Sequence, residues 1–306
     1  MNEIVSRDGH TLDELTNGDL RILVSRSGAE LVSLAKCDSA GEWQGFLVRD
    51  GDVSKNPKGW SNHSTVMGYY IHRILNEKTN YRGHKVKGGT HSFLRHKTFA
   101  PPAVNGNQLT YRFNAQNLHK AEYPYQVDFA ITYILSNKEL QVRFDFENHE
   151  DIPTHVSFGL HPGFAVTDLN QMKVLLPPGR YVRHLAPGNF LSGETLTIDF
   201  NGGLMPFPVG ELPGSFLLDL AGVPERIFIL EDPLSGRKIT LNFTEAPYLT
   251  LWSDGNAFIC IEPCWGLPDH HAQRPFEEKL GMETIAPHGL LQRGFSINPD
   301  FFEFKG

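Results

Sequence analysis

Residues 125–146 read YQVDFAITYILSNKELQVRFDF, and this stretch decides the fold class. Apolar and polar residues alternate on both sides of a polar centre, so that Val127 and Phe129 share one face before it and Val142 repeats the pattern after it. Alternation with period two is typical of a half-buried β-strand. The polar SNKE sequence at residues 136–139 suits a hairpin turn. The stretch therefore predicts two antiparallel strands.

The same alternation recurs along most of the chain, and helical periodicity is scarce. Only residues 276–285 suggest a short helix, whereas the 29 glycines and 20 prolines fall mostly between strand-like segments. We therefore expect an all-β fold, with one large antiparallel sandwich or barrel domain over residues 1–306; two stacked β domains are the alternative. The other strand-like segments are residues 108–115, 155–160, 215–220, 226–230, 238–243, 248–252 and 257–261.

Composition narrows the class of protein. The formal net charge of −7 argues against binding to nucleic acid or to an anionic membrane. Nowhere do about 18 apolar residues run together, and residues 1–15 do not resemble a secretory signal. The three cysteines, Cys37, Cys260 and Cys264, form no CxxC pair, which makes a disulfide framework or a cysteine zinc site improbable. We expect a reduced, soluble, cytoplasmic protein, either a monomer or a homodimer.

Three segments concentrate ionisable and aromatic residues among glycines. The first spans residues 62–99 and is rich in histidine and arginine. It lacks metal-ligand spacing on a convincing helix, so a zinc site fits poorly and we expect no metal. Arg and His donate hydrogen bonds in fixed geometry, so a polyol pocket is one interpretation and a solvated basic loop is the other. Its basic residues are His63, His72, Arg73, His84, His91, Arg95 and His96.

The second segment, HVSFGLHPGF at residues 155–164, places His161 at the expected end of a strand, before a Pro-Gly turn. Histidine suits proton transfer near neutral pH, although a lone histidine is more often structural. The third, LTLWSDGNAFICIEPCWGLPD at residues 249–269, predicts a hairpin that turns at Asp254-Gly255.

Glu262 follows the apolar FICI run of this third segment, at the expected end of the second hairpin strand. Partial burial raises the pKa of a carboxyl group, which suits a general base. The nearby Trp252 and Trp265 have flat faces that pack well on a pyranose ring or in a core.

Three motifs follow one another over residues 62–269. The first is the pair formed by residues 68–73 and THSFLR at residues 90–95, the second is SFGLHPGF, and the third is FICIEPCWGLPD. Together they resemble the aldose 1-epimerase (galactose mutarotase-like) superfamily, most closely its LacX-like branch. The resemblance implies a galactose-mutarotase-like β-supersandwich. It also implies an isomerase that interconverts the α and β anomers of a sugar without a cofactor.

The resemblance also suggests roles for single residues. Glu262 is similar to the general base of the family, and His161 to its general acid. His91 and Arg73 are similar to substrate-binding residues; we add Arg95, Trp252 and Trp265 as further candidates to contact the sugar. Ser92 stands where the family usually has glycine. The acidic sugar-binding residue has two candidates here, Asp219 and Asp232.

Alternatives remain at this stage. A hexose-6-phosphate 1-epimerase would need a phosphate site, for which Arg73, Arg82, Arg95 and His96 offer basic groups. A carbohydrate-binding or sensing module would need no acid–base pair, and a glycosidase would need a second carboxylate. Because the basic residues are spread along the sequence, and not converged in a backbone nest or helix N-terminus that could hold phosphate, we expect a free aldose as substrate.

Overall fold

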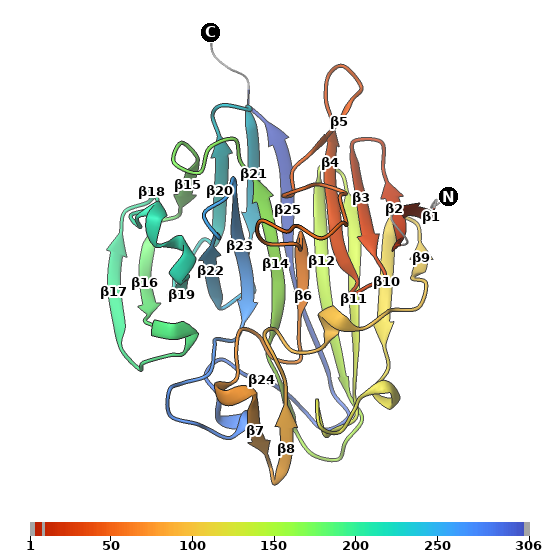
Figure 1. Cartoon of the computed structure of the whole chain (residues 1–306), viewed down its shortest axis with the longest axis vertical. Helices are drawn as coiled ribbons and strands as arrows, with labels where there is room; N and C mark the ends of the chain where they lie inside the picture. The colour runs from red at the N-terminus through yellow and green to blue at the C-terminus, as the bar shows by residue number, and fades with distance from the viewer. Residues whose placement is uncertain (1–3, 8–9, 303–306) are drawn as a thin grey trace.

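The computed structural model describes residues 4–7 and 10–302 and consists almost entirely of β-strands (Figure 1). The described strands form three large sheets and two small two-stranded sheets, and every pairing between named strands is antiparallel. The all-β prediction is confirmed. No helix in the described part of the chain is long and apolar enough to cross a membrane.

A seven-stranded sheet and a nine-stranded sheet make up most of the molecule. The seven-stranded sheet has the order β17 (Thr195–Phe200), β16 (Gly179–His184), β19 (Phe216–Gly222), β22 (Tyr248–Trp252), β23 (Phe258–Trp265), β14 (Phe158–Ala165) and β6 (Ser64–Met67). The nine-stranded sheet has the order β18 (Gly203–Leu204), β15 (Lys173–Leu176), β20 (Ile227–Asp232), β21 (Arg237–Asn242), β25 (Leu290–Phe301), β12 (Glu139–Asn148), β11 (Val127–Ser136), β10 (Gln108–Phe113) and β9 (Ala103–Asn105).

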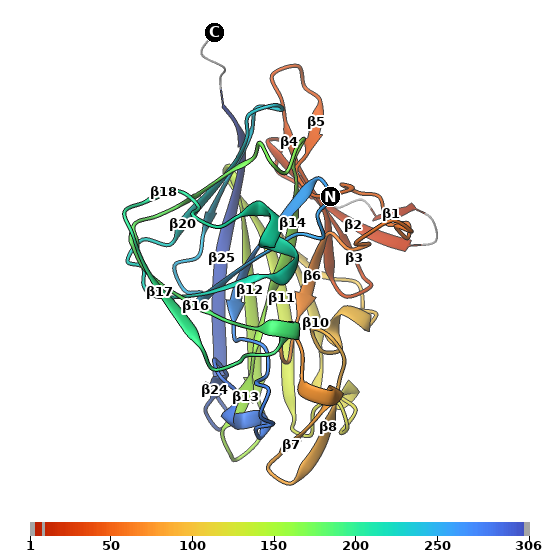
Figure 2. The same cartoon turned by 60° about the vertical axis from the view of Figure 1, so that its left-hand side comes forward.

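Smaller elements flank these two sheets. A five-stranded sheet is formed by β1 (Ile4–Arg7), β2 (His10–Thr16), β3 (Leu20–Ser25), β4 (Glu30–Cys37) and β5 (Trp43–Gly45). It lies on the flank opposite β16 and β17 in both views (Figures 1 and 2). The two small pairs are β7 (Lys78–Tyr81) with β8 (His84–Lys87) and β13 (Thr154–Val156) with β24 (Glu283–Ile285). Within the described residues, six 3-10 turns connect strands: η1 (Leu75–Glu77), η2 (Leu94–His96), η3 (Ala115–Asn117), η4 (Pro187–Asn189), η5 (Val209–Gly214) and η6 (Phe276–Glu278).

The hairpin predicted from residues 125–146 is present as β11 and β12. The two strands pair from Val127–Asn148 to Ser136–Glu139, and the chain reverses through Asn137, whose φ of 51° lies in the left-handed region. Asparagine tolerates this conformation better than most residues, which explains why the polar turn sits here. The hairpin contributes two central strands to the nine-stranded sheet.

The core lies between the two large sheets and is rich in aromatic rings. Phe146 of the nine-stranded sheet packs on Phe158 of the seven-stranded sheet with ring centroids 4.8 Å apart. Phe158 in turn stacks on Trp265 at 5.0 Å. Burial of each such side chain stabilises the fold by roughly 1.5–3 kcal/mol. One cluster of buried apolar residues runs from Leu15 to Ile297. This continuity favours one domain over two stacked ones; the boundaries at residues 1–306 stay a prediction.

The helix expected over residues 276–285 is wrong. Residues Phe276–Glu278 form only the turn η6, and Glu283–Ile285 form β24, which pairs with β13. Gly281 lies between them with a φ of 77° and so ends any helical path. Short apolar runs do not distinguish a helix from a strand by periodicity alone, and pairing with β13 decided the outcome here.

Candidate active site

His161 and Glu262 come from the neighbouring strands β14 and β23 of the seven-stranded sheet, close to its edge strand β6 (Figure 1). Strands β14 and β23 pair at Gly159–Cys264 and again at Gly163–Cys260. The same register places His161 opposite Glu262. Because side chains alternate between the faces of a sheet, both residues point to the face that lies away from the aromatic core.

The expectation that both residues end their strands is wrong. His161 lies inside β14 and Glu262 inside β23, and each strand continues through the proline that follows. Pro162 and Pro263 have no N–H group, and the assigned ladder between the two strands is interrupted at these positions. A proline that usually signals a turn is tolerated here at a break in the ladder, beside the two ionisable residues.

Adjacent strands extend this pair into a row across the sheet. On one side Thr65 of β6 pairs with His161, and on the other side Thr250 of β22 pairs with Glu262. Leu217 of β19 pairs in turn with Thr250. All five side chains line one cavity of about 530 Å³. The sheet register therefore builds the floor of the cavity from residues that are far apart in the sequence.

His161 and Glu262 form a buried pair. Nε2 of His161 lies 3.4 Å from Oε1 of Glu262, and the residues are 7% and 1% exposed. Neither carboxylate oxygen accepts a hydrogen bond from any described residue. Burial raises the pKa of Glu262 well above its ordinary value, and burial lowers the pKa of His161. Each group is thus driven toward its neutral form, and one proton is enough for the pair.

His91 is held by its neighbour His72 through two hydrogen bonds. The backbone N–H of His91 donates to the backbone carbonyl of His72 at 2.8 Å, and the backbone N–H of His72 donates to the ring nitrogen Nδ1 of His91 at 3.1 Å. Nδ1 of His91 is therefore an acceptor, which leaves Nε2 as the protonated nitrogen of the neutral ring. Burial lowers the pKa of His91 well below its ordinary value, and the neighbouring His161, His72, Arg95 and Arg73 lower it further.

His72 is neutral for a related reason. Burial and the nearby Arg73 lower the pKa of His72 to about 4. The sequence had marked His72 only as a member of the basic segment, and the structure places it in the cavity beside His91, with ring centroids 5.6 Å apart. Two neutral imidazoles therefore line the cavity next to the His161–Glu262 pair.

An aromatic wall closes one side of the cavity. Trp60 packs against His161 with ring centroids 4.9 Å apart, and Trp252 meets Trp60 edge-on at 5.8 Å. The sequence predicted Trp252 but missed Trp60, which precedes the first motif. Glycine at position 163 lets this ring approach, because a Cβ there would lie 2.5 Å from the Trp60 ring.

The expectation that Trp265 contacts a sugar is wrong. Trp265 is 0% exposed and stacks on Phe158 between the two sheets. The period of two explains the difference, since Trp265 follows Glu262 by three positions on β23 and so points to the opposite face. Proximity in sequence to a catalytic motif did not imply proximity in space.

The basic residues of the first segment divide into two groups. Arg73, Arg95 and His96 line the cavity together with His91 and His72. The others lie elsewhere: Arg82 donates to the carbonyl of Pro153, His63 is buried beside the carbonyl of Asp52, and His84 is exposed on β8. Arg73, Arg95 and His96 thus meet at one cavity although they are spread along the sequence, as expected for Arg73 and Arg95 as candidate sugar contacts.

Neither candidate for a second acidic residue reaches the cavity. Asp232 accepts hydrogen bonds from Thr167 and Ser235 at the end of β20. Asp219 accepts a hydrogen bond from the Ala221 N–H on β19 and does not line the cavity. Among the residues that the structure describes, Glu262 is the one carboxylate of the lining. The lining residues are Trp60, Asn62, Thr65, His72, Arg73, Thr90, His91, Arg95, His96, His161, Ala186, Asn189, Gly214, Ser215, Leu217, Thr250, Trp252, Glu262 and Pro268.

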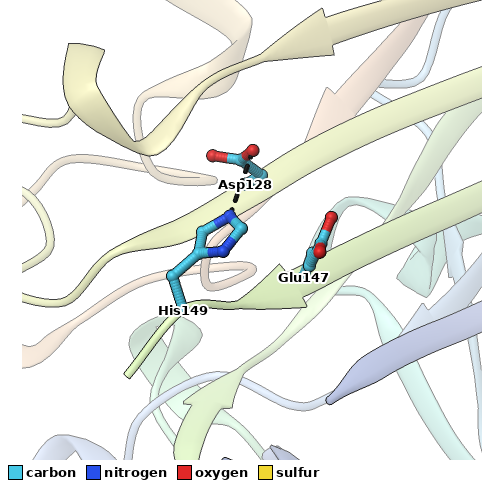
Figure 3. A group of neighbouring side chains, drawn as sticks. All are labelled: Asp128, Glu147 and His149. Atoms are coloured by element: carbon cyan, nitrogen blue, oxygen red, sulfur yellow. Dashed lines mark ion pairs between the residues drawn. The ribbon is translucent and has the colours of Figure 1, made fainter. Parts of the chain in front are cut away.

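Metal-ligating side chains gather outside this cavity. In the described ranges 4–7 and 10–302, the one group of three or more such residues is Asp128, Glu147 and His149, whose ligand atoms lie within 4.8 Å of one another (Figure 3). His149 forms an ion pair with Asp128 at 3.2 Å; Asp128 and Glu147 lie on β11 and β12 of the nine-stranded sheet, and His149 directly follows β12. None of these three residues lines the cavity. The expectation that the reaction needs no metal stays a prediction.

Comparison with known proteins places this geometry in a family. The chain matches the sequence profile of the family described as aldose 1-epimerase over residues 12–290. The chain belongs to the aldose 1-epimerase family. A sequence search of curated proteins gave no match. The family match covers all three motifs and both strands of the His161–Glu262 pair.

Solved structures of the same fold extend the comparison. A galactose mutarotase related enzyme from Lactobacillus acidophilus has a TM-score of 0.85 at 22% identity, with 94% of this chain and 97% of that chain covered. A galactose mutarotase-like protein from Lactobacillus casei has a TM-score of 0.80 at 22% identity, covering 94% and 100%. A galactose 1-epimerase from Lactobacillus acidophilus has a TM-score of 0.71 at 13% identity, covering 99% of each chain. These similarities confirm the galactose-mutarotase-like fold of this family member.

Proposed function

We propose that this member of the family is an aldose 1-epimerase that interconverts the α and β anomers of a sugar, with Glu262 as base and His161 as acid. The observation that carries the proposal is the direct opposition of these two side chains in a cavity of about 530 Å³, with 3.4 Å between Nε2 and Oε1. A pocket of this size accommodates a small polar ligand.

The short separation suits the atoms that must exchange protons. In a cyclic hemiacetal the ring oxygen and the C1 hydroxyl are bonded to the same carbon, so an acid and a base that lie side by side can reach both. Glu262 takes the proton of the C1 hydroxyl while Nε2 of His161 gives a proton to the ring oxygen. The bond between C1 and the ring oxygen breaks, and the electron pair of the O–H bond forms the aldehyde.

Closure reverses these roles after the aldehyde rotates about the C1–C2 bond. Opening leaves a protonated Glu262 and a neutral His161, which are the forms that burial favours. In closure Glu262 returns its proton to the aldehyde oxygen as His161 takes the proton of the attacking hydroxyl. The pair carries one proton throughout the cycle, and no cofactor enters the proton balance.

His91 and Arg73 are proposed to bind the sugar. Because the backbone N–H of His72 donates to Nδ1 of His91, Nε2 of the neutral His91 ring carries the proton. It can donate a hydrogen bond to the ring oxygen or a hydroxyl oxygen of the sugar. The indole rings of Trp60 and Trp252 offer flat apolar faces for the C–H face of a pyranose. A sugar-binding module without catalysis would gain nothing from a buried carboxylate that lacks hydrogen bonds, which is a costly group to retain.

The test is anomer exchange measured by NMR across a panel of aldoses with the parent protein and Glu262→Gln. Gln keeps the size of Glu but takes up no proton, so we expect a loss of roughly 10³-fold or more. Rapid exchange by the parent that persists within tenfold in the variant would remove the base role from Glu262. Binding without any exchange would favour the sensing module. A cytoplasmic location and a monomeric or dimeric state stay predictions.

A further inference from the structure

Asp269 is a buried carboxylate that lies just outside the cavity. It directly follows Pro268, which lines the cavity, and it is 3% exposed. Its Oδ2 accepts hydrogen bonds from Nζ of Lys279 at 2.6 Å and from the backbone N–H of Leu75 at 3.0 Å, and its Oδ1 accepts the backbone N–H of His270 at 2.9 Å. A buried ion pair adds little net stability compared with apolar residues of similar volume. The pair with Lys279 therefore matters mainly for the groups that it holds in place.

Asp269 holds the segment of residues 72–75 at two points. Its backbone N–H donates to the carbonyl of Arg73 at 3.0 Å, and its carboxylate accepts the N–H of Leu75. The segment begins at His72, whose φ of 56° lies in the left-handed region. This region is uncommon for a residue with a Cβ atom, and it persists only where surrounding contacts fix it. The two hydrogen bonds of Asp269 supply such contacts.

The 72–75 segment in turn fixes the ring of His91. The backbone N–H of His72 donates to Nδ1 of His91, while the backbone carbonyl of His72 accepts the backbone N–H of His91. The relative direction of these two His72 groups is set by its backbone dihedral angles, so the two hydrogen bonds depend on the left-handed conformation. With Nδ1 as acceptor, the neutral ring carries its proton on Nε2. The conformation that Asp269 holds thus decides which ring nitrogen of His91 is protonated.

Resting on the proposed function, we propose that Asp269 is a positioning residue for sugar binding, with Lys279 as its counter-ion. Asp269 holds the 72–75 segment, and this segment keeps His91 in the form that donates from Nε2. His161 and Glu262 lie on strands β14 and β23, whose pairing does not involve the segment. Loss of the contact from Asp269 should therefore weaken sugar binding and leave the proton transfers nearly unchanged.

Two double variants separate this role from a purely structural one. Asp269→Leu with Lys279→Met removes both charges and the acceptor for the Leu75 N–H, and it should fold because apolar residues of similar volume often replace a buried ion pair without loss of stability. Asp269→Asn with Lys279→Met removes the same charges but keeps an amide oxygen that can accept this N–H. The backbone groups of Asp269 that bond to Arg73 and to the Leu191 N–H are present in both variants.

Anomer exchange is measured by NMR over a range of concentrations of glucose or galactose, whichever the parent exchanges faster. We expect the Leu double variant to raise KM about 10-fold or more with kcat within threefold, because a misplaced binding group costs affinity. The Asn double variant should keep KM within threefold of the parent. A KM that rises equally in both would assign the effect to the lost ion pair and overturn the inference.

A second measurement does not depend on activity. In protein labelled with nitrogen-15 histidine, the chemical shifts of the ring nitrogens distinguish a protonated nitrogen from an unprotonated one, and the His91 signals are assigned by their loss in His91→Asn. We expect the Nε2–H form of His91 in the parent and in the Asn double variant. The Leu double variant should show a mixture of both tautomers.

The outcomes separate the inference from the proposed function. Exchange by the parent with an unchanged KM in the Leu double variant would overturn the inference and keep the epimerase. If no sugar exchanges, the proposed function fails, and the His91 tautomer decides alone: an unchanged tautomer in the Leu double variant overturns the positioning role, and a changed one supports it. Thermal unfolding verifies that each variant is folded. If the Leu double variant does not fold, Asp269→Ala with Lys279→Met takes its place under the same criteria.

Discussion

His161 and Glu262 lie opposite each other on β14 and β23, with Nε2 of His161 3.4 Å from Oε1 of Glu262. Each is buried, and neither has an alternative partner of opposite charge at ion-pair distance among the described residues. In the proposed mechanism the two side chains therefore act as one unit, and its two members should fail together.

The first prediction concerns this unity. Glu262→Gln and His161→Asn should each reduce the rate of anomer exchange by roughly 10³-fold, and the double variant should be little slower than either single variant. Residues that act in one proton transfer are strongly non-additive. NMR exchange rates of the three variants test this; losses that multiply in the double variant would mean two independent roles.

The second prediction is that Glu262→Gln is more stable than the parent at neutral pH. The pKa of Glu262 in the folded protein lies above its value in the unfolded chain. Below about pH 4.5 both states hold the proton, so the group makes stability independent of pH there; above it the unfolded chain releases the proton while the folded protein retains it, so stability falls as pH rises. The advantage of Glu262→Gln should therefore grow between pH 4 and pH 7.

Urea unfolding at a series of pH values measures this difference. We expect Glu262→Gln to gain stability relative to the parent as the pH rises from 4 to 7, because Gln has no proton that the unfolded chain could release. A constant difference across the pH range would show that the carboxyl group titrates alike in the folded and unfolded states. Such a trade of stability for activity is common at catalytic sites.

The third prediction concerns the loop that carries Arg73. Asp269 donates its N–H to the Arg73 carbonyl and accepts the Leu75 N–H at 3.0 Å, and Lys279 pairs with the same carboxylate at 2.6 Å. Both side chains are almost fully buried. Lys279→Met should destabilise the protein by about 3–5 kcal/mol, because it leaves an unpaired buried carboxylate.

A second substitution checks the cause. Adding Asp269→Asn to Lys279→Met removes the unpaired charge and should restore part of the lost stability, whereas a mere packing defect would not be relieved. Thermal unfolding follows both variants. The exposed pair Arg180–Asp199 is the control, and Arg180→Met should leave the unfolding midpoint unchanged within error, since surface pairs contribute little.

The fourth prediction separates the tryptophans. Trp60→Ala should raise the KM for the sugar about threefold to tenfold, the scale for losing an aromatic contact in a binding site. Trp265→Phe should leave KM unchanged and affect only thermal stability, because the Trp265 ring is enclosed between the sheets. A KM that responds to Trp265→Phe and not to Trp60→Ala would reverse the assignment of the two faces of the sheet.

The sequence by itself determined the all-β class, the β11–β12 hairpin, the family and the pair Glu262 and His161. These depend on local patterns, namely alternation with period two, turn residues and short motifs, which lie within short stretches of the sequence. The sequence could not decide the positions of Trp60, Thr65 and Thr250, because strand register between distant segments is a product of packing.

Only the tertiary structure decided which face each side chain occupies and which charges meet. Trp265 follows Glu262 by three positions and turns to the core, whereas Arg73 and Arg95 converge over the sheet from separate loops. Sequence spacing measures distance along a chain, but a site is formed by loops that close over a sheet and by the pairing of β6, β14, β23 and β22. The meeting of Arg73 and Arg95 at one cavity therefore became visible only in the folded molecule.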